Sequence, residues 1–137
     1  MSKVLVMEDD LELSFVLKNG LEAAGYEVVV RTSASDAIEE LSTETYDMLI
    51  SDIIVMKDRR SVPDGGIALI GWVRRSKKYC EMPIIVISGT SAYPGMANIL
   101  TAARRIGADV ALEKPFTVED LLSEIDALKS RVAGAGA

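Results

Sequence analysis

Acidic side chains follow two short apolar runs of this sequence. Glu8 and Asp9 come directly after the run Val4–Met7, and Asp52 comes directly after the run Met48–Ser51. Carboxylates gathered in one place repel one another, and each raises the pKa of its neighbours unless a cation compensates. Oxygen ligands in a chain without histidine favour Mg²⁺ over zinc or copper. The pattern therefore predicts a magnesium site, provided that the fold brings the two runs together.

The acidic residues also have a plainer explanation. Asp9 and Asp10 could cap the helix that follows them, because carboxylates complement the positive end of a helix dipole, and Asp52 could be an ordinary loop residue. For Asp10 alone, the helix cap is the better interpretation. For Glu8, Asp9 and Asp52 together we favour the metal site, because chance alone is a poor explanation for acidic residues directly after both apolar runs.

A hydroxyl and an ammonium group follow two further apolar runs. Ser88 comes after Ile84–Ile87, and Lys114 comes shortly after Val110–Leu112. Taken singly, a serine after a strand is usually a turn residue and a lysine is usually a solvated charge. Together with Mg²⁺, however, these groups could surround a phosphoryl group while a carboxylate attacks it.

The elements that must position these residues are short apolar strands separated by helices. Runs without strict alternation of apolar and polar residues indicate strands covered on both faces, as in a parallel sheet. Strands that alternate with helices imply right-handed crossovers, and thus an α/β, flavodoxin-like (βα)5 doubly wound sheet with strand order 2-1-3-4-5 and helices on both faces. The ligand crevice of such a sheet lies between strands 1 and 3. The predicted strands are Val4–Met7, Glu27–Val30, Met48–Ser51, Ile84–Ile87 and Val110–Leu112.

Capping patterns mark two of the expected helices. Ser33 precedes Asp36 by three residues, and Thr117 precedes Asp120 by the same spacing, as in a capping box. Further helices are expected over residues 66–77 and 95–106. We assign residues 1–132 to one domain and residues 133–137 to a flexible tail of low complexity.

The bulk composition limits the classes of function. A chain of 137 residues with 49% hydrophobic side chains can bury the core of one domain. Its net charge of −6 argues against direct binding of nucleic acid, which needs a surplus of Lys and Arg. Cys80 is the only cysteine, so no intrachain disulfide can form and a cytoplasmic location is expected. No apolar stretch approaches the ~20 residues of a membrane-spanning helix, so no membrane partner is expected.

In its ordered set of polar residues the chain resembles, over nearly its whole length, the receiver domain of two-component response regulators. The set is Glu8-Asp9, Asp52, Ser88 and Lys114-Pro115-Phe116. The resemblance implies that Asp52 is the phosphoacceptor and that Lys114 and Ser88 contact the phosphoryl oxygens. It also implies that Glu8, Asp9, Asp52 and the backbone carbonyl of Ile54 hold Mg²⁺, and that the Lys114–Pro115 peptide is cis.

The function expected from this resemblance is phosphoacceptor signalling in a two-component phosphorelay. A sensor histidine kinase or a histidine phosphotransfer protein would transfer its phosphoryl group to Asp52 in an Mg²⁺-dependent step, and the domain would then change shape. Such a domain is not an enzyme, since it catalyses only its own phosphorylation and dephosphorylation. The downstream protein partner is unknown from the sequence. A homodimer, with Arg104 and Arg105 facing the acids of the last helix, stays open.

Three alternatives compete with this function. A pseudo-receiver would use the same fold for protein interaction without phosphorylation, but it is expected to lack an acid, the acceptor or the lysine, and none is missing here. A flavodoxin-like electron carrier needs a hydroxyl-rich phosphate loop after strand 1, where this chain has acids. An aspartate-nucleophile phosphatase needs its nucleophilic aspartate on strand 1 and a second aspartate two positions later. Glu8-Asp9-Asp10 supplies that spacing only with a glutamate in the first position.

The sequence departs from the receiver pattern in two places. Residues 57–63 lengthen the loop after Asp52 by a handful of polar residues. This is either a harmless surface insertion or a basic loop that contacts a partner or shields the acyl phosphate. Ala111 stands three positions before Lys114, where receivers often carry an aromatic residue. In receivers, movement of the hydroxyl residue at the position of Ser88 is usually coupled to that aromatic ring. With Ala111 in its place, this coupling cannot operate in its familiar form.

Overall fold

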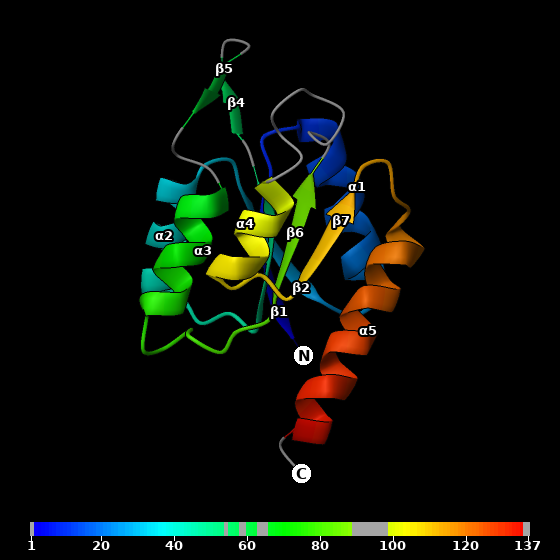
Figure 1. The fold of residues 1–137 in the computed structure, drawn as a ribbon. Coiled ribbons are helices and arrows are strands. Elements are labelled where there is room, and N and C mark those ends of the chain that lie inside the picture. The colour runs from blue at the N-terminus through cyan, green and yellow to red at the C-terminus, as the bar shows by residue number, and fades with distance from the viewer. Residues whose placement is uncertain (1, 54, 58–59, 63–65, 89–98, 136–137) are drawn as a thin grey trace.

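A five-stranded parallel sheet forms the centre of the computed structural model (Figure 1), which describes residues 2–53, 55–57, 60–62, 66–88 and 99–135. The strand order is β2-β1-β3-β6-β7, which is the predicted order 2-1-3-4-5 when the strands of this sheet are counted along the chain. Every neighbouring pair in it is parallel. Its strands are β1 (Lys3–Met7), β2 (Glu27–Arg31), β3 (Met48–Asp52), β6 (Ile84–Ser88) and β7 (Val110–Glu113).

The central strands are apolar on both faces because both faces are covered. All five residues of β3 and of β6 are buried, as are the last four of β1. Burial at successive positions is what a parallel sheet between two helical layers requires. Asp52 and Ser88 are the last residues of their strands, so each strand is one residue longer than the apolar run predicted. Both side chains are therefore carried on the rigid sheet.

Helices cover the two faces of the sheet. Helices α1 (Leu11–Ala23) and α5 (Val118–Ala135) pack on one face, and α2 (Ala34–Thr43), α3 (Gly66–Arg75) and α4 (Ile99–Ile106) pack on the other. Each face has its own apolar core, one built around Leu17, Leu21 and Ile125, the other around Leu41, Leu69 and Ile70. In the described ranges, no helix is both long and apolar enough to cross a membrane.

The helix ends confirm the capping patterns. The Asp10 carboxylate accepts a hydrogen bond from the Leu13 N–H at 3.2 Å, and the Ser33 hydroxyl accepts one from the Asp36 N–H at 3.1 Å. Thr117 and Asp120 exchange two hydrogen bonds of 3.0 Å, as a capping box requires. Helix α5 continues to Ala135, through part of the expected tail, and residues 136–137 lie outside the described part of the chain. The start of the helix expected over 95–106 also lies outside it.

A small antiparallel sheet lies where the sequence predicted only a long polar loop after Asp52. Strands β4 (Val55–Lys57) and β5 (Arg60–Val62) pair with Val55 opposite Val62 and Lys57 opposite Arg60. Strands of three residues are too short to show an alternating pattern, which is why no strand was predicted here. The hairpin stands above the carboxyl ends of the central strands (Figure 1) and belongs to a sheet of its own.

Candidate functional site

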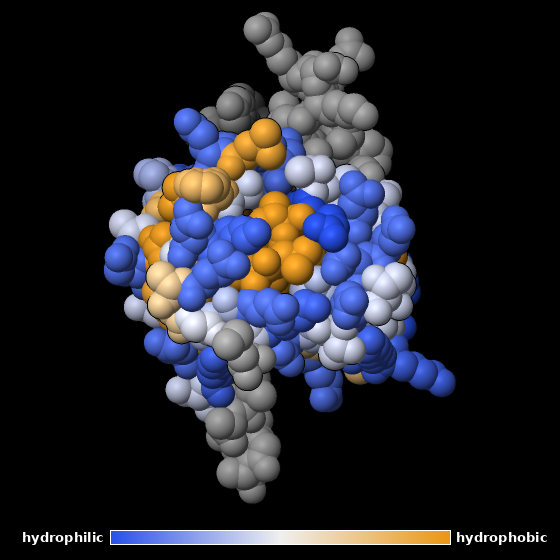
Figure 2. Space-filling view, turned by 180° about the vertical axis from the view of Figure 1, so that it is seen from behind, coloured by the Kyte–Doolittle hydropathy of each residue, from blue (hydrophilic) through white to orange (hydrophobic). Residues whose placement is uncertain are grey.

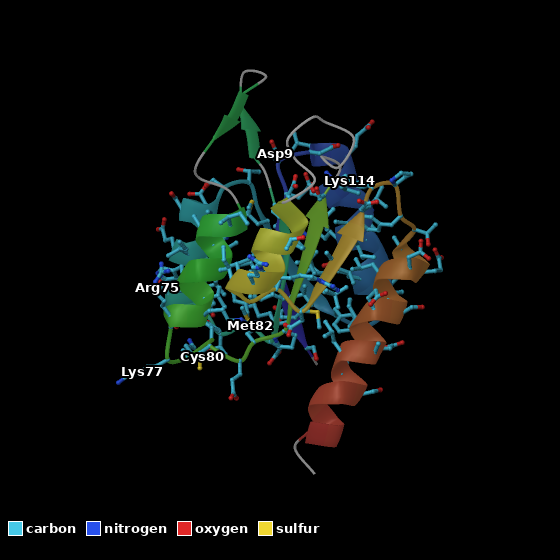
Figure 3. All side chains as sticks on the ribbon, in the orientation of Figure 1. Asp9, Arg75, Lys77, Cys80, Met82 and Lys114 are labelled. Atoms are coloured by element: carbon cyan, nitrogen blue, oxygen red, sulfur yellow. The ribbon has the colours of Figure 1, made fainter. Side chains whose placement is uncertain are left out.

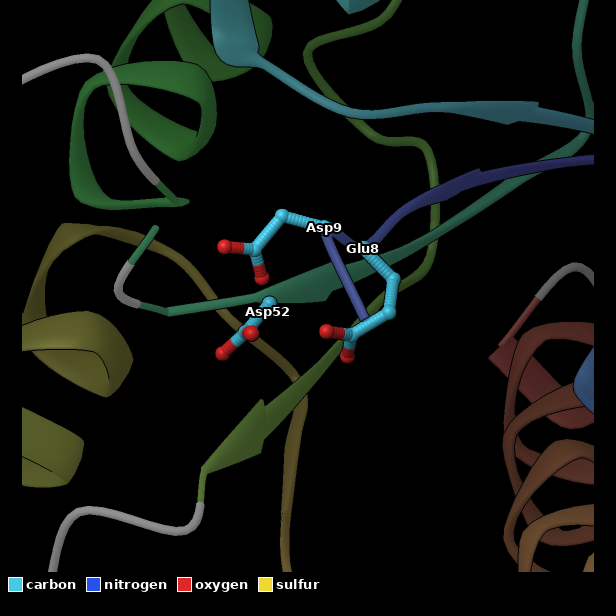
Figure 4. A group of neighbouring side chains, drawn as sticks. All are labelled: Glu8, Asp9 and Asp52. Atoms are coloured by element: carbon cyan, nitrogen blue, oxygen red, sulfur yellow. The ribbon is translucent and has the colours of Figure 1, made fainter. Parts of the chain in front are cut away.

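Three carboxylates meet at the carboxyl ends of β1 and β3. Glu8 and Asp9 are the first two residues after β1, and Asp52 ends β3, which pairs directly with β1. Carboxylate oxygens of Glu8, Asp9 and Asp52 all lie within 4.8 Å of one another. Figure 4 shows the three side chains turned toward a common space. The crevice between strands 1 and 3 is thus where the predicted acids gather.

Lys114 supplies a cation to this cluster. Its Nζ atom lies 3.3 Å from Glu8 Oε2 and 3.6 Å from Asp52 Oδ2. The Lys114 N–H donates to the Ser88 carbonyl at 2.8 Å, and the Lys114–Pro115 peptide is cis, as expected. Figure 3 shows Lys114 and Asp9 at one end of the molecule, near the carboxyl ends of the strands, and Cys80 at the opposite end. Strands β1, β3 and β7 therefore deliver charges of both signs to one place.

The pKa of Glu8 is strongly perturbed. Its side chain is fully buried, and burial together with the negative charge of Asp52 raises its pKa to about 8. The ammonium of Lys114 opposes this shift but does not outweigh it. For Lys114 the balance is reversed: burial lowers its pKa, but the charges of Asp52 and Glu8 prevail and raise it above its ordinary value. The site without a metal thus holds more negative charge than Lys114 neutralises.

The donor atoms fit a hard divalent cation. Glu8 Oε2 is buried and accepts no hydrogen bond of good geometry from the described residues, although Lys114 Nζ is nearby. Buried carboxylate oxygens in this condition are stabilised by a cation. The donors of Glu8, Asp9 and Asp52 are all oxygens, which Mg²⁺ prefers. These three residues could hold the ion between them.

Three further positions were singled out from the sequence: Ser88, Ile54 and Ala111. Ser88 is fully buried at the end of β6, one residue after Ile87, the register partner of Asp52. Ile54, whose carbonyl was expected to bind the metal, lies outside the described residues. Ala111 is half-buried on β7 and packs against the core on the α2–α4 face, so no aromatic ring occupies that position.

Two residues beside Asp52 were not singled out from the sequence. The Ser51 hydroxyl is fully buried and donates to the Asp52 carbonyl at 2.9 Å. Gly66 opens α3 and packs directly against the main chain of Asp52 and Ile53. The Gly65-Gly66 pair was the available signal for the second contact, but a glycine pair after a loop has many explanations.

Glu8→Gln is expected to stabilise the metal-free protein at alkaline pH. Because the folded-state pKa of Glu8 is raised from 4.5 to about 8, the folded protein holds a proton that the unfolded chain has lost between these values. The free energy of unfolding therefore falls as pH rises from about 4.5 through about 8. A neutral amide removes this pH dependence, so the Glu8→Gln protein should be more stable by about 1–3 kcal/mol at pH 9, with a smaller difference at pH 5.

Urea unfolding in EDTA at both pH values measures this difference. Asp10→Asn serves as the control, because it also replaces a carboxylate by an amide and asparagine can still cap α1. A Glu8→Gln protein that is less stable than the wild type at pH 9 would show that the Glu8 carboxylate is compensated within the folded site.

Comparison with known proteins places this chain in a family. The response regulator receiver domain family matches residues 4–126, and the chain belongs to that family. Response regulator receiver domains act in two-component signalling as phosphoacceptor domains, and histidine kinases or phosphotransfer proteins are their partners. The flavodoxin-like sheet described above is the fold of receiver domains.

Individual relatives are similar over nearly the whole chain. The swarming motility regulation protein RssB of Serratia marcescens is 31% identical over 133 residues, which cover 96% of this chain and 54% of RssB. A chemotaxis protein CheY homolog of Campylobacter jejuni is 29% identical, with 98% of both chains covered. The chain thus spans about half the length of the first curated relatives and the full length of CheY homologs.

Solved structures share the fold. The receiver domain of a signal transduction histidine kinase from Syntrophus aciditrophicus superposes with a TM-score of 0.80 at 26% identity, covering 96% of this chain and 92% of that one. A CheY-like receiver domain protein from Methanospirillum hungatei has the same TM-score of 0.80 at 21% identity, covering 96% of this chain and 95% of its own.

Proposed function

We propose that this chain accepts a phosphoryl group on Asp52 from a phosphohistidine, in a step that depends on Mg²⁺, and signals by changing shape. The observation that carries the proposal is the position of Lys114, whose ammonium lies 3.3 Å from Glu8 and 3.6 Å from Asp52. A cation placed beside both the nucleophilic carboxylate and Glu8 suits the transfer of an anionic group. On this proposal the chain is not an enzyme that turns over a separate substrate.

The chain's own residues would divide the chemistry among them. A carboxylate oxygen of Asp52 attacks phosphorus, the bond from phosphorus to the imidazole nitrogen breaks, and the imidazole leaves with its electron pair and takes up a proton from water. The product is an acyl phosphate on Asp52. Lys114 would hold the phosphoryl oxygens by charge, and Ser88 would donate a hydrogen bond to them. Ile54 would add its backbone carbonyl to the metal ligands.

Magnesium, when bound, would neutralise charge on the phosphoryl oxygens and orient them. Glu8, Asp9 and Asp52 are the residues that would hold it, because their oxygens lie within 4.8 Å of one another. A cytoplasmic location belongs to the same proposal, since Cys80 has no second cysteine with which to form a disulfide.

The test is the intact mass of the protein after incubation with acetyl phosphate, with Mg²⁺ or with EDTA. A gain of one phosphoryl mass that needs Mg²⁺, located on the peptide containing Asp52, supports the proposal. An unchanged mass, together with failure to bind beryllofluoride, would replace it with the pseudo-receiver alternative, in which the fold serves protein interaction alone.

The phosphodonor is proposed to be a protein, a sensor histidine kinase or a histidine phosphotransfer protein, because an exposed apolar surface adjoins the site. Leu11, Phe15 and Val16 of α1 are 73%, 67% and 52% exposed. Figure 2 shows apolar side chains among hydrophilic ones on the side of the molecule that carries α1. Helix α1 begins immediately after the acidic residues, so a protein seated on this surface could reach Asp52. The downstream partner and a homodimer stay open.

Phe15→Ala is expected to slow transfer from a protein donor by about tenfold while leaving transfer from acetyl phosphate unchanged. The phenyl ring contributes buried area only when a protein covers it, and acetyl phosphate is too small to do so. The measurement compares both donors, using a histidine phosphotransfer protein selected because it phosphorylates the wild-type chain. Ile106→Ala on α4, which removes an exposed apolar side chain elsewhere, is the control. Equal slowing with both donors would contradict a docking role.

A further inference from the structure

The main chain of Asp52 is held by contacts that the proposed chemistry does not use. Ser51 Oγ donates to the Asp52 carbonyl at 2.9 Å from a fully buried position. The next residue, Ile53, donates its N–H to the Ile87 carbonyl at 3.0 Å and accepts a hydrogen bond from the Gly66 N–H at 3.1 Å. The peptide between Asp52 and Ile53 is therefore fixed to β6 through its N–H, and the carbonyl that follows it, that of Ile53, is fixed to the start of α3.

Gly66 approaches this peptide more closely than any other residue type could. A Cβ atom at Gly66 would overlap the Asp52 carbonyl oxygen and would lie 2.8 Å from Ile53 Cα. Both obstacles are main-chain atoms, so neither can swing aside as the end of a side chain could. The φ angle of Gly66 is not in the left-handed region, in contrast to Gly25 and Gly107. Glycine is therefore required here by space and not by backbone conformation.

We propose that Gly66 is a positioning residue for the phosphoacceptor, and that Ser51 supports it by fixing the same carbonyl. This inference rests on the proposed function of Asp52. Any side chain at position 66 must push the Asp52–Ile53 main chain away from α3, and the carboxylate moves with it. Displacements of ~1 Å can slow a positioned reaction by ~100-fold. Glu8, Asp9 and Lys114 would stay in place, because they directly follow β1 and β7, which do not contain the displaced main chain.

The experiment compares Gly66→Ala with Gly71→Ala, two identical changes in the same helix. The three atoms nearest to a Cβ at Gly71 all belong to the Arg75 side chain, with Nη1 at 3.1 Å, and that side chain can move. With acetyl phosphate at saturating Mg²⁺, Gly66→Ala should lower the maximal phosphorylation rate by at least tenfold and leave the half-saturating donor concentration unchanged. Gly71→Ala should match the wild type. A wild-type maximal rate in Gly66→Ala protein that circular dichroism shows to be folded would overturn the proposal.

A second readout separates this inference from the proposed function. If the wild type gains no phosphoryl mass, the proposed function fails, but the position of Asp52 can still be followed through metal binding. Mn²⁺ titration should then show at least fivefold weaker binding for Gly66→Ala and unchanged binding for Gly71→Ala. Equal Mn²⁺ affinity in all three proteins would overturn the positioning role of Gly66.

Ser51→Ala keeps the proposal testable if Gly66→Ala does not fold. It removes one hydroxyl without adding any atom, so the Asp52 carbonyl loses a hydrogen bond and no clash arises. The expected loss is about threefold to tenfold in the maximal phosphorylation rate. Ser14→Ala, which removes a buried hydroxyl bonded to the Leu11 carbonyl, is the matched control. Equal rates for both serine variants would count against positioning through the main chain of Asp52.

Discussion

Asp52→Asn protein is expected to gain no phosphoryl mass from acetyl phosphate or from a protein donor. Asparagine keeps the size and shape of the side chain, but its amide is not a nucleophile that can form an acyl phosphate. Asp52 lies beside Lys114 and belongs to the metal cluster, and Glu8, the other carboxylate with both features, has a fully buried side chain. We expect a reduction of at least about 100-fold in adduct formation, measured by intact mass at equal times.

Asp10→Asn is the matched control for this loss. It changes a carboxylate of the Glu8-Asp9-Asp10 stretch to an amide, but asparagine still caps α1, so phosphorylation should continue. Circular dichroism should show both variants folded. An adduct of normal yield on Asp52→Asn protein would mean that another group accepts the phosphoryl, and the role assigned to Asp52 would be wrong.

The sheet and the meeting of its acids could be predicted from the sequence because both depend on pattern and topology. Continuous apolar runs identified the buried strands, and the order 2-1-3-4-5 placed strands 1 and 3 side by side. From that order alone, Glu8, Asp9 and Asp52 had to share one edge, and their oxygens do lie within 4.8 Å of one another. Strand polarity likewise predicted that Lys114 would reach the same edge.

What could not be predicted depends on distances between main-chain atoms and on burial. The closeness of Gly66 to Asp52 follows from how α3 docks on β3, which no spacing in the sequence reports. Burial raises the pKa of Glu8 to about 8, and a sequence shows only that acids repel. The β4–β5 pair was missed because its strands have three residues each and the sequence between them contains no glycine.

Lys114→Met is expected to slow phosphorylation and to strengthen metal binding. Methionine keeps the length of the side chain but removes the positive charge that would hold the phosphoryl oxygens, so the rate at saturating Mg²⁺ should fall by about 100-fold. The same ammonium lies 3.3 Å from Glu8 and 3.6 Å from Asp52, where it competes with a metal ion for both carboxylates. Its removal should therefore tighten Mn²⁺ binding by about fivefold, which corresponds to about 1 kcal/mol.

The opposite signs of these two effects make the test specific. A variant that merely disturbed the fold would lose metal affinity and phosphorylation together, whereas loss of a competing cation improves one and impairs the other. Lys77→Met is the control, because Lys77 follows α3 at the end of the molecule opposite Asp9 and Lys114 (Figure 3), and its charge is far from the acids. Weaker Mn²⁺ binding by the Lys114→Met protein would contradict this prediction. Lys114 would then hold the carboxylates in position for the metal ion instead of competing with it.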